Sequence, residues 1–67
     1  MITIRLNGKD EIVKESFSLM ELLKNKNIIP ETVVVALNMN VVNQNDLDKT
    51  FILNGDNVEI LRFVAGG

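Results

Sequence analysis

"FSLMELLKNKN", residues 17–27, is the stretch where the spacing of apolar residues changes to that of a helix. Ser18 and Glu21 form an S-x-x-E capping box, in which each side chain can bond to a backbone amide of the other residue. Three leucines at helical spacing form an apolar stripe: Leu19, Leu22 and Leu23. Asn27 suits a left-handed cap. We therefore predict one short amphipathic helix over about residues 19–26.

Two strands are predicted on the N-terminal side of this helix. "MITIRLNG", residues 1–8, alternates between apolar and polar residues, which indicates a half-buried strand. Asn7-Gly8 is a strong signal for a tight hairpin turn because both residues tolerate positive φ. The residues that follow can return as a second strand, so residues 1–15 predict a β-hairpin.

Three more strands are predicted on the C-terminal side. "TVVVALN", residues 32–38, is almost wholly apolar, which predicts a strand buried on both faces at the centre of a sheet. A short strand is expected at residues 41–42, followed by a polar connection anchored by Leu47. A turn at residues 54–56 then precedes an alternating strand, with Val58 and Ile60 facing the core.

This order of elements predicts an α+β fold with the β-grasp, or ubiquitin-like, architecture. A mixed sheet of four to five strands would pack on one helix, with a right-handed crossover between parallel strands. A chain of 67 residues allows one domain at most. We place that domain at residues 1–63 and a flexible C-terminal tail at residues 64–67.

Composition excludes several classes of function. Seven basic and nine acidic residues give a net charge of −2, and this balance argues against nucleic-acid binding. Histidine and cysteine are absent, so the usual general bases, nucleophiles and thiolate metal ligands are missing. We expect no catalytic residues and no bound cofactor. Without a signal-peptide pattern or a long apolar run, we expect a soluble, cytoplasmic protein that is a monomer when free.

The acidic pairs Asp10-Glu11 and Asp46/Asp48 are candidates for a metal or acid–base site. Neighbouring side chains on a strand point to opposite faces, so the first pair does not converge easily. Carboxylates of this kind are mostly solvated, and we expect no metal site. Gly8 and Gly55 open no helix and are expected to be turn residues rather than phosphate ligands.

Leu61 and Phe63 are candidates for a partner-binding patch. If Val58 and Ile60 face the core, these two side chains lie on the opposite face of the strand. They can be scattered apolar surface, which is normal, or a clustered interface. Both interpretations stay open, and Met39 is a weaker candidate for the same patch.

The sequence ends in Val64, Ala65, Gly66 and Gly67. Such an end can simply fray, as termini commonly do. Glycines also give a thin backbone without Cβ atoms, able to enter a slot too narrow for side chains. The one chemical group there is the α-carboxylate of Gly67, which becomes an acyl donor once another protein activates it.

At this point the sequence resembles the ThiS-type sulfur carrier proteins of thiamine biosynthesis. The resemblance spans the chain and rests on four segments: "SLMELL" (18–23), "VVVALNMNVV" (33–42), "LNGDNVEIL" (53–61) and "FVAGG" (63–67). It implies that an E1-like adenylating enzyme uses ATP and Mg²⁺ to adenylate Gly67. Sulfur from a cysteine desulfurase or a similar donor would then give a thiocarboxylate, which thiazole synthase consumes. Leu61 and Phe63 would contact these enzymes.

Two other functions fit the same fold. The small subunit of molybdopterin synthase also ends in Gly-Gly, but that family is usually longer and often has prolines before its tail. Here Pro30 is the only proline. A ubiquitin-like interaction module without sulfur chemistry is the alternative from a different class. A small nucleotide- or RNA-binding β-grasp domain is disfavoured by the acidic balance.

Overall fold

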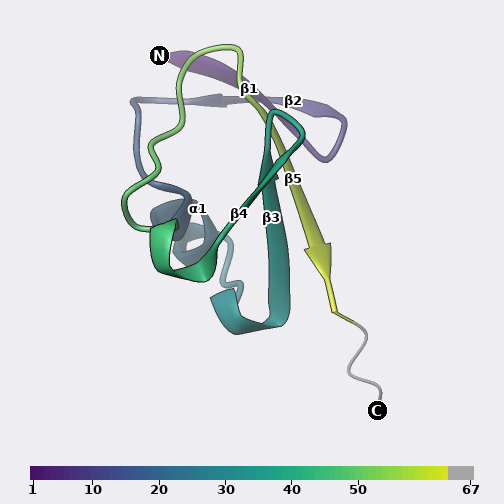
Figure 1. The fold of residues 1–67 in the computed structure, drawn as a ribbon. Coiled ribbons are helices and arrows are strands. Elements are labelled where there is room, and N and C mark those ends of the chain that lie inside the picture. The colour runs from purple at the N-terminus through teal and green to yellow at the C-terminus, as the bar shows by residue number, and fades with distance from the viewer. Residues whose placement is uncertain (64–67) are drawn as a thin grey trace.

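A computed structural model describes residues 1–63, which form a mixed five-stranded sheet and one α-helix (Figure 1). The elements in chain order are β1 (Ile2–Leu6), β2 (Lys9–Val13), α1 (Leu19–Asn25), β3 (Val33–Leu37), β4 (Asn40–Val42) and β5 (Asn57–Arg62). Short 3-10 turns lie at Pro30–Thr32 and Gln44–Asp46. The predicted β-grasp architecture, its hairpin and its single helix are confirmed.

The strands are arranged in the order β2-β1-β5-β3-β4. β1 and β5 are parallel, and every other neighbouring pair is antiparallel. The connection through α1 leads from β2 to β3, two strands that run in the same direction but are separated by β1 and β5. The last strand, β5, is therefore the central one. The prediction that residues 32–38 form the centre of the sheet was wrong by one strand.

The core lies between α1 and one face of the sheet (Figure 1). It consists of nine side chains that are almost fully buried: Ile4, Leu19, Leu22, Leu23, Val33, Val35, Leu47, Ile52 and Val58. Leu47 and Ile52 come from the connection between β4 and β5, which bonds to α1 through Leu19 N–H and Thr50 O at 2.9 Å. The polar connection thus closes the core beside the helix.

Only one face of β3 is buried in this core. Val33 and Val35 are 1% and 2% exposed, whereas Val34 and Ala36 are half-buried. The prediction of burial on both faces was wrong because, within residues 1–63, no helix covers the second face. An apolar strand with one uncovered face leaves hydrophobic surface available to other molecules. We refer to this uncovered side of the sheet as the open face.

The predicted capping box starts α1. Ser18 Oγ accepts from the Glu21 N–H at 3.1 Å, and the Ser18 N–H donates to Glu21 Oε1 at 3.4 Å. At the other end, Lys26 is the C-cap and Asn27 has φ 58°, as predicted for a left-handed cap. Within residues 1–63, no helix has the length and hydropathy needed to cross a membrane.

Ser18→Ala is expected to lower the free energy of unfolding by about 1 kcal/mol, the usual cost of removing such a cap. Ser18 is 4% exposed, so water does not readily replace the lost acceptor. Urea unfolding followed by circular dichroism measures the change. Glu21→Gln is the control, because glutamine also completes a capping box. A Ser18→Ala protein as stable as the wild type would contradict the assigned role.

Candidate functional site

Leu61 and Phe63 lie on the open face of the sheet, as strand alternation predicted. Val58 is fully buried and Ile60 packs against the core, so the side chains between and after them point away from α1. Leu61 is 68% exposed and Phe63 is 55% exposed. Two large apolar side chains therefore face solvent at the C-terminal end of the central strand.

Two valines extend this surface across the neighbouring strands. Val34 of β3 is the cross-strand partner of Leu61, and Val41 of β4, 68% exposed, pairs with Ala36 on the same face. Val34, Val41 and Phe63 help to line a hollow of about 300 Å³, together with the polar residues Glu31 and Gln44. We define the apolar patch by its four larger side chains: Val34, Val41, Leu61 and Phe63. The sequence analysis missed both valines.

Met39 lies at the opposite end of the β3–β5 ladder from Leu61 and Phe63. It occupies the turn between β3 and β4, beyond the Leu37–Val58 end of the β3–β5 ladder, whereas Phe63 lies beyond the opposite end. Its side chain is 82% exposed and its φ is 75°. The structure therefore does not bring Met39 together with Leu61 and Phe63.

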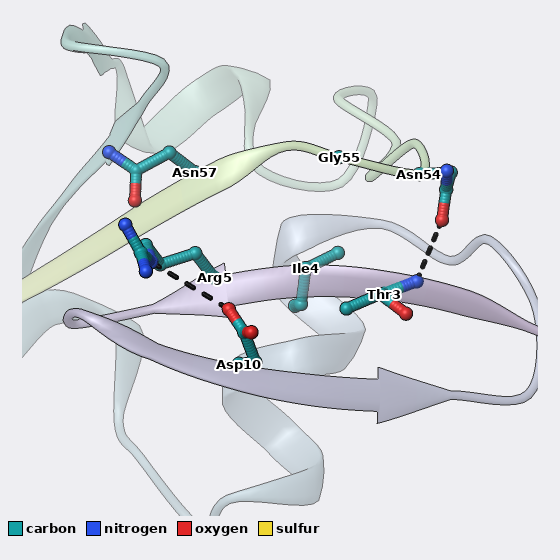
Figure 2. A pocket seen from close by; sticks show the side chains of 7 residues that line it. All are labelled: Thr3, Ile4, Arg5, Asp10, Asn54, Gly55 and Asn57. Atoms are coloured by element: carbon teal, nitrogen blue, oxygen red, sulfur yellow. Dashed lines mark hydrogen bonds and ion pairs between the residues drawn. The ribbon is translucent and has the colours of Figure 1, made fainter.

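The other half of the open face carries polar residues of β1 and β2 beside the exposed Ile12. A hollow of about 590 Å³ lies there between β1 and the turn before β5, and its lining residues are Thr3, Ile4, Arg5, Asp10, Asn54, Gly55 and Asn57 (Figure 2). Although this hollow is larger, its polar groups bond to one another. The Thr3 N–H donates to Asn54 Oδ1 at 2.8 Å, and Arg5 Nε lies 3.7 Å from Asp10 Oδ1. These contacts engage the Thr3 amide and pair Arg5 with Asp10.

The acidic candidates form no site. Asp10 faces Arg5, while Glu11 pairs with Lys26 of the helix C-cap at 2.9 Å, so the two carboxylates take different partners. Asp46 and Asp48 are exposed. Among the residues that the structure describes, no group of three or more acidic side chains gathers to hold a metal ion. Gly8 and Gly55, with φ of 83° and 88°, are the predicted turn glycines.

The tail residues Val64, Ala65, Gly66 and Gly67 lie outside the described residues. Phe63 is the last described position, and its N–H donates to Thr32 O at 2.9 Å. The apolar patch thus ends one residue before Val64. Any partner that binds the patch is within a few residues of the Gly-Gly segment, since an extended chain spans about 3.3–3.6 Å per residue.

The comparison with protein families decides the relationship. A model of the ThiS family matches residues 3–67, which covers the sheet, the helix and the Gly-Gly end. The chain belongs to the ThiS family. The resemblance to ThiS-type proteins that the sequence indicated is confirmed as membership of the family. A search of curated proteins finds no match.

Two solved structures support the ThiS assignment. The crystal structure of the thiamine biosynthesis protein ThiS from Geobacter metallireducens is 36% identical, with a TM-score of 0.86. The match covers 98% of this chain and 100% of that one. A solution NMR structure of a thiamine biosynthesis protein from the same organism is also 36% identical, with a TM-score of 0.81 over 98% and 88% of the two chains. ThiS membership supports the role of a small carrier protein rather than an enzyme.

Proposed function

We propose that this ThiS-family chain is a sulfur carrier whose Gly67 carboxylate is converted to a thiocarboxylate for thiazole formation in thiamine biosynthesis. The observation that carries the proposal is the family match, which runs to Gly67. The similar crystal structure from Geobacter metallireducens is that of a thiamine biosynthesis protein, which favours the thiazole pathway over molybdopterin synthesis.

The chemistry proceeds in two stages at the terminal carboxylate group. A carboxylate oxygen of Gly67 attacks the α-phosphorus of ATP, and pyrophosphate leaves with Mg²⁺. The outer sulfur of a persulfide on the donor then attacks the acyl carbon, and AMP leaves with the original carboxylate oxygen. A thiol next attacks the donor's sulfur in the resulting acyl disulfide, so that the donor leaves as a mixed disulfide with that thiol. The product is a thiocarboxylate that can pass its sulfur to a thiazole synthase. An adenylating enzyme and a sulfur donor, such as a cysteine desulfurase, supply the reactants.

The carrier itself contributes recognition to these steps. Its sequence has neither histidine nor cysteine, so the partner enzymes provide the catalytic groups. Leu61 and Phe63, together with Val34 and Val41, form the surface that the partners bind. Exposed apolar side chains that cluster on one face are typical of interaction sites. Because Met39 lies at the other end of β3, it is not included in this surface.

Intact-protein mass spectrometry tests the proposal. Incubation with the adenylating enzyme, ATP, Mg²⁺ and a sulfur donor should replace one oxygen of Gly67 with sulfur. Omission of ATP is the control, because no acyl-adenylate can form without it. Adding a thiazole synthase or a molybdopterin synthase large subunit then distinguishes the pathways, since only the cognate enzyme should consume the thiocarboxylate. Failure to form either adenylate or thiocarboxylate would refute the sulfur-carrier function.

A further inference from the structure

Two backbone positions of the central strand β5 are each bound by an asparagine side chain from a hairpin turn. At the start of β5, Asn38 Oδ1 accepts from the Asn57 N–H at 2.9 Å. Farther along β5, Asn7 Oδ1 accepts from the Ile60 N–H at 2.7 Å, and Asn7 Nδ2 donates to Ile60 O at 3.3 Å. Side chains from the β3–β4 and β1–β2 turns thus bond to the β5 backbone.

Asn7 continues the pairing of β1 beyond the end of that strand. Its own N–H donates to Val58 O at 2.9 Å, after which the chain turns into β2. The next residue of β5 that presents its backbone to this edge is Ile60, because backbone groups alternate between the two edges of a strand. The Asn7 carboxamide satisfies both the N–H and the C=O of Ile60. It therefore replaces one further residue of β1.

Asparagine meets three requirements at this position. Asn7 has φ 49°, a left-handed conformation that asparagine, aspartate and glycine tolerate best. The Ile60 N–H needs an acceptor, which glycine lacks. The Ile60 carbonyl needs a donor, which an ionised aspartate lacks. Asparagine therefore provides the hydrogen-bond donor, the acceptor and the tolerance of positive φ in one residue.

We propose that Asn7 is a positioning residue for the sulfur-carrier chemistry, an inference that rests on the proposed function. The C-terminal half of β5 is held by β3 on one edge, where the Phe63 N–H donates to Thr32 O at 2.9 Å. Asn7 holds the other edge at Ile60, next to Leu61. By fixing β5 from both edges, Asn7 sets the orientation of Leu61 and Phe63.

Hydrogen exchange at single amides tests the contact itself. Asn7→Gly keeps a residue that favours positive φ and removes only the carboxamide. We expect the Ile60 amide to lose protection by roughly tenfold, as for the loss of a structural hydrogen bond, while the Leu61 amide retains it. Asn38→Gly is the matched control, because Asn38 has φ 50° and bonds to the other end of β5. Asn38→Gly should increase hydrogen exchange at the Asn57 amide and leave the Ile60 amide protected.

Steady-state thiocarboxylate formation tests the positioning role. At a temperature where all proteins are fully folded, Asn7→Gly should raise the KM for the carrier by roughly tenfold, reflecting the two lost hydrogen bonds. The kcat should remain within about twofold of the wild type, because the substitution affects binding of the carrier to the enzyme and not the chemical steps that follow. Asn38→Gly should change neither constant by more than about twofold. Asn7→Asp should behave like Asn7→Gly, because a carboxylate oxygen then faces the Ile60 carbonyl.

The outcomes separate the two proposals. Equal loss of activation in Asn7→Gly and Asn38→Gly would show that Asn7 only stabilises the fold, and would overturn the positioning role. Unchanged Ile60 protection in Asn7→Gly would overturn the contact. Failure of the wild-type protein to be activated would instead refute the sulfur-carrier function, whatever the exchange data show.

Discussion

Deletion of Gly67 is expected to abolish thiocarboxylate formation without changing the stability of the fold. The same result is expected when one residue is added after Gly67. In either case the reacting carboxylate moves along the chain by up to about 3.3–3.6 Å. A displacement of about 1 Å at a reacting atom can already cost a hundredfold in rate, so the loss should be at least about a hundredfold. Mass spectrometry of the carrier measures the product.

Stability should remain unchanged because the buried core ends at Val58, with Ile60 packed against it. Insertion of one glycine between Met1 and Ile2 is the matched control. Met1 is 90% exposed and precedes β1, so this insertion lengthens the chain equally while leaving the C-terminal carboxylate in place. Unfolding of the Gly67 deletion would show that the end of the chain is structural. Normal activation of that variant would refute Gly67 as the modified residue.

Leu61→Asp is expected to weaken binding to the adenylating enzyme by roughly tenfold to a hundredfold, the range for a central apolar contact in an interface. Phe63→Asp should act similarly. Both changes place a carboxylate in the apolar patch, which must then be desolvated on binding. Titration calorimetry with the purified enzyme measures the dissociation constant, and urea unfolding measures the stability of each variant.

Ile12→Asp is the matched control for these substitutions. Ile12 is 66% exposed, close to the 68% of Leu61, and it lies in β2 opposite Thr3. Both variants place an aspartate at a similarly exposed strand position, but only Leu61 belongs to the apolar patch. Because β2 is an edge strand and β5 is the central one, urea unfolding of Ile12→Asp measures its own stability cost. A Leu61→Asp protein that fails to fold would identify Leu61 as a core residue. Equal weakening by Ile12→Asp would mean that binding does not depend on the patch.

The local elements were predictable because their causes are local. The capping box at Ser18 and Glu21 starts the helix where expected, and Asn7-Gly8 turns the first hairpin. Strand alternation placed Val58 in the core and Leu61 on the opposite face. In each case a few neighbouring residues determine backbone conformation and side-chain direction, so the pattern in the sequence is sufficient.

The arrangement of the strands was less predictable. The apolar run at residues 33–37 does not reveal whether its second face is covered by protein or left open. It also does not reveal which strand is central, and the predicted central position was wrong. Met39 was named as a weaker candidate for the patch of Leu61 and Phe63, and its separation from them depends on the strand register, which the sequence does not contain. Val34 and Val41 joined the patch only once the cross-strand register was known.

The side-chain contacts of the turn asparagines could not be inferred either. The sequence indicates that Asn7 tolerates positive φ, but its partner Ile60 lies 53 positions away. The side chain of Asn38 likewise bonds to Asn57, which lies 19 positions away. Such contacts depend on which strands become neighbours, and that is a property of the whole sheet.

The central position of β5 has a consequence for how the protein is made. The β1–β2 hairpin and the β3–β4 hairpin have no strand in common until β5 enters between them. A ribosome synthesises β5 last among these strands, so the sheet closes only when synthesis of the described chain is nearly complete. Chains that stop before residue 57 lack the strand that joins the two hairpins. Prematurely terminated products therefore lack the closed sheet together with Leu61 and Phe63, and we expect them to compete poorly for the enzymes that act on the finished carrier.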